Sequence, residues 1–399
     1  MYTILRDKNN GLKDEVLSFA QKLVRTPSPS NSEAPAGVLV QEKMKELGYD
    51  KVVRDELGNV AGVLLGVEAG PTLLLECHLD TVGANGRWEA ASCQGDIKNG
   101  LLHGLGSADC KGGLAAQIFA GALLKRCLLP LKGNLIVAAT VAEENGRSFG
   151  LRALLEKTLP ELELKPDYAI LGEPTNMGLY YGHDGWLQAE VQIEGKNDFD
   201  LDNKTVRSFF QEYRDDQDIS GGMLEEGAVL STQTVHGPGH QRLRIETARR
   251  LHVNEQVGDV LGKLQRDAAL MTKAIGGAAV EVQVQEAAAN AARGIAQAWE
   301  MDPFSPLMER ARHALGAAGL KARPGRWRLG RLGMGTAGGL LFNQFKIPVL
   351  GYGPGDEELA HASNEFVETA KICECVYGTA AIAHALIGVP VYGWTGDEI

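Results

Sequence analysis

The sequence predicts an α/β protein with a layered core domain and a smaller α+β domain inserted into it. Three observations lead to this prediction. The chain has 399 residues, which is too long for one ordinary core and favours two domains. Helix-like and strand-like segments alternate through residues 14–171, as they do in layered α/β domains. Beyond residue 182 the order becomes βαββαβ, which is typical of a small ferredoxin-like sheet with two helices.

Hydrophobic spacing predicts the first elements of the core. Residues 14–25 and 33–47 carry apolar side chains at helical spacing, and residues 51–65 alternate like a hairpin. The later elements are a hairpin at 95–103, a glycine turn at 104–109, a helix at 111–126, a strand at 134–141, a helix at 148–155 and a strand at 168–171.

The stretch 71–83, PTLLLECHLDTVG, combines a buried strand with two chemically active side chains. Its leucine run is short and apolar, as a buried strand requires. Because a strand alternates its faces, His78 and Asp80 point the same way. A carboxylate beside a histidine fixes the ring tautomer that offers a lone pair to a metal ion. A purely structural histidine at a strand end is the alternative, and the rest of the chain has to decide between them.

The inserted domain begins after two glycines, Gly182 and Gly185, whose spacing suits a hinge. We expect the core to comprise residues 1–184 and 290–399, and the insert to comprise residues 185–289. The predicted elements of the insert are strands at 187–193, 228–235, 243–249 and 279–285, with helices at 205–213 and 257–271. The core then resumes with a helix at 304–318, a strand at 347–350 and a closing helix at 365–387.

Composition and charge exclude several classes of partner. Hydrophobic residues make up 44% and charged residues 23% of the chain, as in soluble globular proteins. The net charge of −11 argues against nucleic acid or an anionic membrane as a partner. No apolar run reaches the length of a membrane span, and the first residues lack the apolar core of a signal peptide. The six cysteines have no spacing typical of a disulfide framework, which predicts reduced thiols and a cytoplasmic location.

Acidic and imidazole side chains recur just after the predicted strands or in glycine-rich turns. Each alone has an ordinary structural explanation, such as a helix cap or a solvated loop. Together they would meet at the carboxyl ends of the strands, where open α/β sheets bind ligands. Carboxylates and imidazoles in this mixture suit zinc, cobalt or manganese. The set comprises His78 with Asp80, Asp109, Glu143 with Glu144, Glu173, and His361.

These segments together resemble the M20 family of metallopeptidases and amidohydrolases. That family includes carboxypeptidases, aminoacylases, acetylornithine deacetylase and succinyl-diaminopimelate desuccinylase. The resemblance covers the core on both sides of the insert and looks closest to the YgeY-like branch, through residues 299–302 and the loop 353–355. The motifs that carry it are His78-Leu79-Asp80, residues 106–113 (GSADCKGG), Glu143-Glu144, residues 172–175 (GEPT) and residues 361–365 (HASNE).

The resemblance implies a zinc-peptidase-like core that binds two divalent metal ions, most naturally zinc, with cobalt or manganese as substitutes. It implies that Asp80 orients the ring of His78. Asp109 would bridge the two ions, because it has no histidine beside it. One ion would be held by His78, Asp109 and Glu173, and the other by Asp109, Glu144 and His361.

The resemblance assigns the proton transfer to Glu143. Neighbouring residues point apart, so Glu144 can bind metal while Glu143 faces a metal-bridging water. Such a water has a pKa near neutrality, and a carboxylate within hydrogen-bond reach can take its proton and pass it to the leaving amine. The implied activity is hydrolysis of an amide bond in an N-acyl amino acid or a small peptide.

The insert departs from the family pattern in ways that bear on the substrate. The family's insert pairs with its copy in a homodimer and supplies a histidine after its first strand, but residues 195–200 contain none. His236, His240 and His252 lie in the insert and could replace it, with a solvated or capping role as the alternative for each; we expect His236 or His240, in a turn at 235–241, to act across the dimer. Arg250 matches the family's arginine for a substrate carboxylate. The family's hinge arginine, the acid of its insert strand and the acid of its late Thr-Asp pair are replaced here by Asp184, Ala248 and Ala337.

Two other interpretations remain open at this point. A family member with an altered insert could bind metal yet lack full catalysis, and turnover on N-acyl amino acids and dipeptides would separate it from an active enzyme. Residues 333–338 match G-x-G-x-x-G, which would indicate a dinucleotide-dependent oxidoreductase. The basic stretch 326–331 before this motif is unlike a first Rossmann strand, and cofactor absorbance in the purified protein would be the test.

Overall fold

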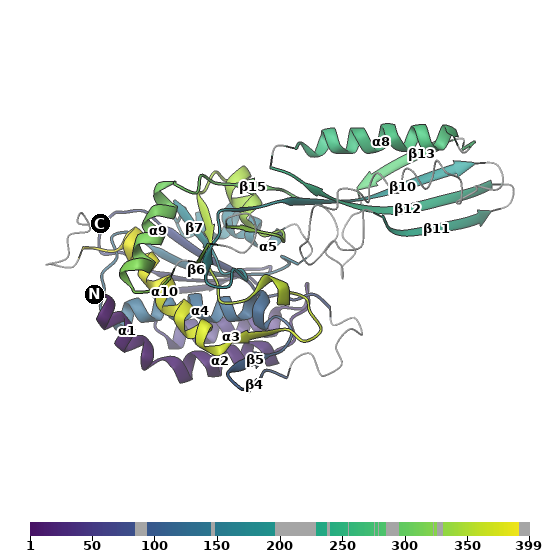
Figure 1. Ribbon diagram of the computed structural model, residues 1–399. Helices are drawn as coiled ribbons and strands as arrows, with labels where there is room; N and C mark the ends of the chain where they lie inside the picture. The colour runs from purple at the N-terminus through teal and green to yellow at the C-terminus, as the bar shows by residue number, and fades with distance from the viewer. Residues whose placement is uncertain are drawn as a thin grey trace.

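The protein is represented by a computed structural model with a mixed α/β core and an elongated second domain beside it (Figure 1). The helix that the sequence predicts at 205–213, and the stretch 196–200 that lacks the family's histidine, lie outside the described residues. The described residues are 1–83, 94–144, 148–195, 229–237, 240–253, 255–274, 276–277, 279–284, 295–321, 323–324 and 330–390.

The core is built on a six-stranded sheet with the order β1-β2-β6-β3-β7-β18. β6, β3, β7 and β18 are parallel neighbours, whereas β1, β2 and β6 are joined by antiparallel pairings. The leucine run of β3 is fully buried, as expected for a parallel strand covered on both faces. The strands are β1 (Lys51–Arg54), β2 (Val60–Leu64), β3 (Leu73–His78), β6 (Leu135–Thr140), β7 (Tyr168–Leu171) and β18 (Val349–Gly351).

Helices cover the sheet, and α4 with α10 forms the most extensive helix pair beneath it (Figure 1). α4 is buried along nearly its whole length, which explains why its sequence is rich in alanine and leucine instead of amphipathic. The core helices are α1 (Tyr2–Asn10), α2 (Lys13–Arg25), α3 (Ala34–Glu46), α4 (Gly112–Arg126), α5 (Phe149–Ala153), α6 (Leu159–Glu161), α9 (Pro306–Ala317) and α10 (Thr369–Ile387), with helical turns η1 (Ser107–Lys111), η2 (Leu154–Thr158), η3 (Leu340–Gln344) and η4 (Glu357–Leu359).

One helix in the described part of the chain, α10, is long and apolar enough to cross a membrane by length and composition alone. The sequence prediction that no apolar run reaches this length is therefore wrong for α10. In the structure 78% of its apolar window is buried inside the protein, against α1, α2, α4 and α9. A core helix has this composition for the same reason that a membrane helix does, because apolar atoms surround it.

The second domain is an antiparallel sheet with the order β11-β12-β10-β13, and it extends away from the core (Figure 1). Helix α8 packs on one face, over Val191, Ile193 and Ile245. This strand order, with α8 between β12 and β13, is that of the predicted ferredoxin-like domain. The elements are β10 (Gly185–Gly195), β11 (Val229–Gly237), β12 (His240–Leu251), α8 (Val257–Ala274) and β13 (Ala279–Val284).

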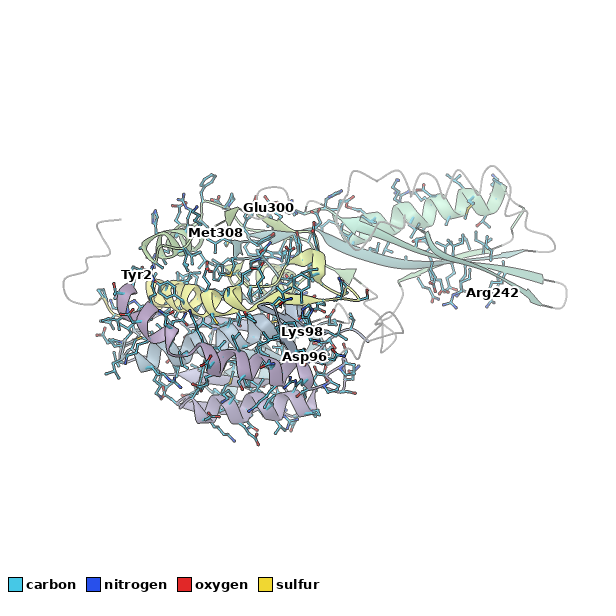
Figure 2. The ribbon with its side chains drawn as sticks, turned by 60° about the horizontal axis from the view of Figure 1, so that its bottom comes forward. Tyr2, Asp96, Lys98, Arg242, Glu300 and Met308 are labelled. Atoms are coloured by element: carbon cyan, nitrogen blue, oxygen red, sulfur yellow. A yellow bond between two sulfur atoms is a disulfide. The ribbon has the colours of Figure 1, made fainter. Side chains whose placement is uncertain are left out.

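The opposite face of this sheet is polar. Glu190 and Glu194 of β10 accept hydrogen bonds from Nε of Arg244 (2.6 Å) and Nε of Arg242 (2.9 Å) of β12. Arg242 lies on the extended domain, away from the core (Figure 2). Opposite charges on paired strands stabilise an antiparallel pair modestly. The sheet therefore has one apolar face under α8 and one charged face toward solvent.

The two domains meet at a small three-stranded sheet of β9 (Gly182–His183), β15 (Trp299–Glu300) and β17 (Arg331–Leu332). The sequence predicts a glycine hinge here, but Gly182 is held in this sheet, and a Cβ on it would come within 2.6 Å of the Trp299 carbonyl oxygen. Close backbone approach therefore requires this glycine. Beside it Arg331 binds the carboxylates of Asp184 (2.5 Å) and Glu300 (3.1 Å).

The last predicted helix begins later than the sequence suggests. Residues 366–368 form a strand, β19 (Phe366–Glu368), because they pair with β5 (Leu101–His103), which in turn pairs with β4 (Asp96–Lys98). α10 starts only at Thr369. Helix α1 was not predicted, and neither were the short pairs made by β8 (Gly178–Leu179) with β16 (Arg323–Pro324) and by β14 (Ile295–Ala296) with β10.

Candidate metal centre

Three parallel neighbours, β6, β3 and β7, deliver the candidate residues to one edge of the core sheet. His78 is the last residue of β3 and stands opposite Thr140, the last residue of β6. Glu144 and Glu173 follow shortly after the ends of β6 and β7. Because parallel strands end together, side chains far apart in sequence converge at this edge, where α/β sheets bind ligands.

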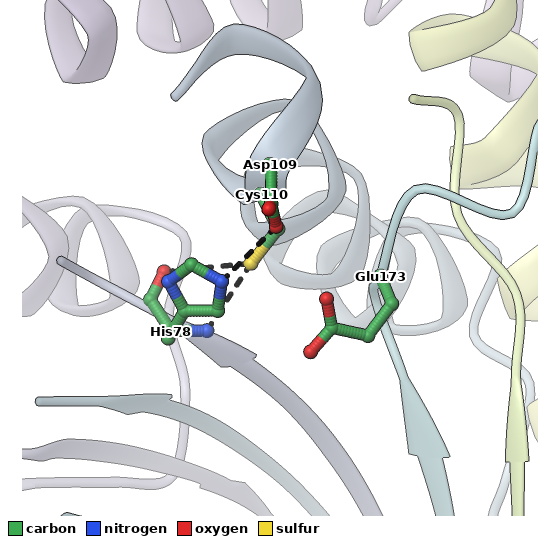
Figure 3. A group of neighbouring side chains, drawn as sticks. All are labelled: His78, Asp109, Cys110 and Glu173. Carbon is green, nitrogen blue, oxygen red and sulfur yellow. Dashed lines mark hydrogen bonds and ion pairs between the residues drawn. The ribbon is translucent and has the colours of Figure 1, made fainter. Parts of the chain in front are cut away.

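The ring of His78 is fixed by hydrogen bonds at both nitrogens. Nδ1 lies 2.9 Å from the main-chain oxygen of Asp80, and because a carbonyl can only accept, this nitrogen carries the proton. Nε2 donates to Oδ1 of Asp109, 3.2 Å away (Figure 3), and it is the nitrogen whose lone pair would face a metal ion once its proton is lost. The side chain is 1% exposed. His78 is thus held in the tautomer that a metal ligand requires.

Asp109 lies between the two histidines. It belongs to the π-helical turn η1, with φ −122° and ψ 92°, and its peptide bond to Cys110 is cis. Its Oδ1 faces Nε2 of His78, and its Oδ2 lies 3.3 Å from Nε2 of His361. A carboxylate that turns one oxygen to each of two imidazoles is arranged to bridge two ions. Oδ2 is buried, and its contact with His361 is an ion pair.

His361 and Glu144 form the far side of the site. Nε2 of His361 lies 3.0 Å from Oε2 of Glu144 and within reach of Asp109, so three potential ligand atoms face a common point. His361 has φ 60°, in the left-handed region that costs a branched or bulky residue energy. The structure keeps the ring in the site despite this conformation.

Asp80 makes contacts that the sequence did not predict. Its carboxylate lies 3.6 Å from Nδ1 of His78, which the main-chain oxygen already occupies. Instead Oδ1 accepts from the backbone N–H of Glu143 (3.1 Å), and Oδ2 accepts from that of Glu144 (3.0 Å) and from the hydroxyl of Ser30 (2.7 Å). The carboxylate of Asp80 therefore holds the Glu143–Glu144 turn, and its backbone holds the histidine.

The two histidines sit in a strongly acidic environment. Burial alone would lower the pKa of His78, but the hydrogen bond and charge of Asp109 outweigh it and raise that pKa well above its ordinary value. The pKa of His361 is likewise raised against the effect of burial, by the charge of Glu144 and by hydrogen bonds to Asp109 and Glu144. Contact with both histidines lowers the pKa of Asp109 although burial opposes it.

The ionised forms of the remaining carboxylates are destabilised by burial and by their closeness to one another. Burial raises the pKa of Glu143 and of Glu173 well above the ordinary value, and nearby acids add to this effect while His78 opposes it. Burial also raises the pKa of Glu144, against the charge of His361. Two divalent ions would supply the positive charge that these carboxylates lack, so the donor set fits the pair of ions that the sequence predicts.

The ligand atoms fall into two groups that share Asp109. Within each group the atoms all lie within 4.8 Å of one another. In Figure 3 His78 lies on the left, Asp109 above the centre, and Glu173 on the right. The groups are His78, Asp109, Cys110 and Glu173, and Asp109, Glu144 and His361.

Cys110 belongs to the first group by position but is joined to Cys77 in a disulfide, with Cα atoms 6.5 Å apart. The prediction of reduced thiols is therefore wrong for this pair. Their separation of 33 residues carries no spacing signal, because the contact is created by packing of η1 against β3. A thiolate is the form of cysteine that binds metal, so a disulfide-bonded Cys110 is no ligand and the group reduces to an imidazole and two carboxylates.

The predicted substrate-binding residues lie on the second domain. Arg250 is on β12, opposite Trp186 of β10. His236 and His240 flank the β11–β12 turn, which lies at the end of the domain farthest from the core (Figure 1). The backbone places these residues, while their side chains lie outside the described part. The structure of one chain does not bring the two histidines to the metal cluster.

The glycine motif at 333–338 serves the domain junction. It follows β17, a two-residue strand. Within the motif, the backbone N–H of Thr336 donates a hydrogen bond to Nε2 of His183 at 3.0 Å. Burial lowers the pKa of His183 to about 4, so this ring is a neutral acceptor. Since the motif lies between a two-residue strand and the short helical turn η3, and not between a long buried strand and a long helix, the structure gives the dinucleotide interpretation no support.

Sequence reasoning missed three residues that shape the site. Ser30 binds Asp80, and Glu33 accepts from the N–H of Ala142 (3.0 Å), just before Glu143. Glu365 accepts hydrogen bonds from the turn that carries Asp109. Glu365 ends the predicted motif 361–365, whereas Ser30 and Glu33 lie well before the first motif; the partners of all three are distant in sequence, so only the fold reveals their contacts.

The profile of peptidase family M20/M25/M40 matches residues 74–386, which is most of the chain. The chain belongs to this family. The match confirms the family that the motifs predicted. The M20 core and insert also account for the order of elements, since the profile runs from β3 through the second domain to α10.

Relatives of this M20 protein differ in how much they share with it. The uncharacterized protein YgeY of Escherichia coli (strain K12) is 27% identical over 197 residues, 49% of this chain and 47% of YgeY, so this chain spans about half the length of that relative. The [LysW]-lysine hydrolase of Deinococcus radiodurans is 27% identical over 382 residues, 92% of this chain and 96% of that protein.

Solved structures confirm the fold class. The Bacillus subtilis YXEP protein, described as a dinuclear metal binding peptidase from the M20 family, superposes with a TM-score of 0.70 at 16% identity. The superposition covers 94% of this chain and 98% of that one. At this identity the likeness shows the fold alone, a layered core with an inserted second domain.

Proposed function

We propose that this M20 protein is a metal-dependent hydrolase that cleaves the amide bond of an N-acyl amino acid or a small peptide. The observation that carries the proposal is the position of Asp109, whose two carboxylate oxygens face Nε2 of His78 and Nε2 of His361 at 3.2 and 3.3 Å. Such a carboxylate is the shared element that a pair of neighbouring ions requires. The dinuclear description of the related YXEP protein supports the same arrangement.

We assign the ligands as the motifs suggested. His78, Asp109 and Glu173 would hold one ion, and Asp109, Glu144 and His361 the other. Imidazole with carboxylate suits zinc first, and cobalt or manganese as substitutes. Bound there, the ions would polarise the scissile carbonyl and lower the pKa of the attacking water.

Glu143 is the proposed general acid/base. The hydrogen bond of its N–H to Asp80 fixes the turn that separates it from Glu144, so one carboxylate can face substrate while its neighbour faces metal. Its raised pKa in the metal-free cluster comes first from burial, and added cations would bring it down toward the working range of a base. Glu143 would take a proton from the attacking water and deliver it to the leaving amine.

Substrate contacts and the dimer complete the proposal. Arg250 is the proposed partner of a substrate carboxylate. The insert, residues 185–289, would pair with its copy in a homodimer, which would bring the partner's β11–β12 turn toward this chain's site. His236 or His240 would then stabilise the developing oxyanion, a contribution typically of about 3 kcal/mol. The position of this turn at the far end of the insert supports a role across subunits and not within one.

The test is hydrolysis by metal-reconstituted protein. Metal-free protein is loaded with zinc, cobalt or manganese, its metal content is measured, and it is assayed on N-acetyl and N-succinyl amino acids, dipeptides and lysine joined to LysW. His78→Ala is expected to lose one ion and turnover. His313→Ala, on the exposed surface of α9, is the control and should behave as wild type.

The outcomes separate the alternatives. Turnover of any panel member with two ions per chain supports the hydrolase. Two ions without turnover on any member favours the second candidate, a metal-binding family member whose altered insert no longer supports catalysis. Wild-type protein that takes up no first-row metal, with His78→Ala unchanged, would refute the metal centre itself.

A further inference from the structure

Glu365 is a buried carboxylate that the proposed mechanism does not use. It is 1% exposed and lies just before β19. β19 pairs antiparallel with β5, with Phe366 opposite His103. Because the chain runs from β5 directly into the turn that carries Asp109, this register sets Glu365 beside that turn. A contact across more than 250 residues of sequence is thereby fixed by one short strand pair.

Glu365 accepts four hydrogen bonds from the turn. Its Oε2 accepts from the N–H of Gly106 at 2.9 Å. Its Oε1 accepts from Ala108 at 2.8 Å and from Asp109 at 3.0 Å, and its main-chain oxygen accepts from Gly104 at 3.0 Å. Burial raises the pKa of Glu365 to about 8, and these backbone hydrogen bonds act in the opposite direction. Three of these four bonds are made by the side chain of Glu365 and one by its main chain.

The turn is shaped to present these N–H groups together. Gly106 has φ 79°, a left-handed conformation, and a Cβ there would come within 2.6 Å of Thr81. Successive N–H groups in such a turn form a concave site for an anion. Here the carboxylate of Glu365 fills that site. The turn therefore depends on hydrogen-bond acceptors supplied by a distant segment of the same chain.

That segment also carries His361, four residues before Glu365. The N–H of Glu365 donates to the main-chain oxygen of Ala362 at 3.2 Å, which ties it to the segment of the histidine. One residue thus connects the backbone of Asp109 to the backbone that positions His361. The imidazole and the bridging carboxylate meet at 3.3 Å in the same site.

We infer that Glu365 is a positioning residue of the metal centre: its carboxylate fixes the backbone of Asp109 so that one side-chain oxygen faces each histidine. The inference rests on the proposed function, because it concerns how that site binds its ions. Glu365 belongs to neither group of potential ligand atoms. It acts through the conformation of the bridging ligand, in the way that outer partners of metal ligands orient them.

The test compares Glu365→Gln with Glu368→Gln in the full-length protein. Glutamine keeps the length and volume of Glu365, but its amide nitrogen must face at least one backbone N–H that now lacks an acceptor. Glu368 is a matched control, since it is close in sequence and largely exposed, and it pairs with Lys371 at 2.6 Å away from the cluster. Zinc affinity is measured by competition with a chromophoric chelator, and ligand geometry by the absorption spectrum of the cobalt form.

Glu365→Gln is expected to bind zinc about 10- to 100-fold more weakly and to show an altered cobalt spectrum. Glu368→Gln should match wild type in both. The unfolding midpoint of the metal-free proteins separates positioning from simple stabilisation. A lower midpoint with unchanged zinc affinity and an unchanged cobalt spectrum would overturn the inference.

If Glu365→Gln does not fold, Glu365→Asp carries the same test, because it keeps the charge but withdraws the carboxylate from the turn by one methylene. Wild-type affinity and spectrum in that variant would also overturn the inference. A wild-type protein that binds no metal would refute the proposed function and this inference with it. Normal metal binding by wild type with unchanged Glu365 variants refutes the inference alone.

Discussion

Substituting Asp80 by asparagine is expected to weaken binding of the ion proposed for Glu144, while binding of the ion proposed for His78 stays largely unaffected. The side chain of Asp80 accepts from the N–H groups of Glu143 and Glu144 at 3.1 and 3.0 Å. Its main-chain oxygen, which the substitution leaves in place, accepts from Nδ1 of His78 at 2.9 Å. Asp80→Asn therefore separates two roles that one residue combines.

The magnitude follows from the hydrogen bonds that are lost. Asparagine keeps one carbonyl oxygen, so whichever way its amide is turned, the N–H of Glu143 or Glu144 faces an amide N–H₂ group. A hydrogen bond to a charged group is worth about 1.5–3 kcal/mol, and each 1.4 kcal/mol is a factor of ten in a binding constant. Transmitted to the position of Glu144, this corresponds to roughly 10- to 100-fold weaker binding of the second ion.

The assay is a zinc titration of metal-free protein against a competing chelator. Glu144→Ala and Glu173→Ala serve as references for loss of one or the other ion. Asp96→Asn, at an exposed position on β4 (Figure 2), controls for the change of charge. Asp80→Asn should resemble Glu144→Ala. A pattern that resembles Glu173→Ala would show that the carboxylate works through His78 instead, and would refute the reasoning.

Three further predictions concern catalysis, stability and assembly. Glu143→Ala should keep both ions and lose about 10²–10⁴-fold in kcat, whereas Glu144→Ala should lose one ion; equal metal loss in both would contradict the assignment. Burial lowers the pKa of His384, in α10, to about 4 from an unfolded value near 6.5. The unfolded chain thus gains its proton first as pH falls, so up to about 3 kcal/mol of stability should be lost between pH 6.5 and 4. His384→Leu should remove that part of the slope in urea unfolding at pH 7 and pH 4.5, and an unchanged slope would count against it. Light scattering should find a dimer, and deletion of residues 185–289 a monomer; a monomeric wild type with normal turnover would exclude the trans role.

Hydrophobic periodicity was enough to locate the ends of β3, β6 and β7, and with them most of the candidate site. The prediction succeeded because a buried parallel strand leaves a short apolar run, and the residue that follows it must emerge at the sheet edge. His78, Glu144 and Glu173 are all reached in this way. The local pattern therefore locates the strand ends, where the proposed ligands lie.

The contacts that hold these residues could not be read from the sequence. Asp80 was expected to bind the ring two residues away, but its carboxylate binds a turn more than 60 residues on. Glu365 looked like the start of a helix, because the apolar spacing of α10 extends toward it. Residues 366–368 instead form strand β19, which pairs with β5. Such long-range hydrogen bonds leave no period in the sequence, so they appear only once the chain is folded.

Because β12 is long, a small rotation at the junction between the domains would move the outer end of the second domain a long way. The strand has 12 residues, so at about 3.3 Å per residue it reaches roughly 40 Å from Leu251, beside the junction, to His240 at the outer turn. A rotation of about 10° at the junction would sweep the outer turn through about 7 Å, given that strand length. The ion pairs of Arg331 with Asp184 and Glu300 lie at the junction, where such a rotation would take place. Small changes in these contacts are therefore magnified into large displacements of the histidines at the outer turn.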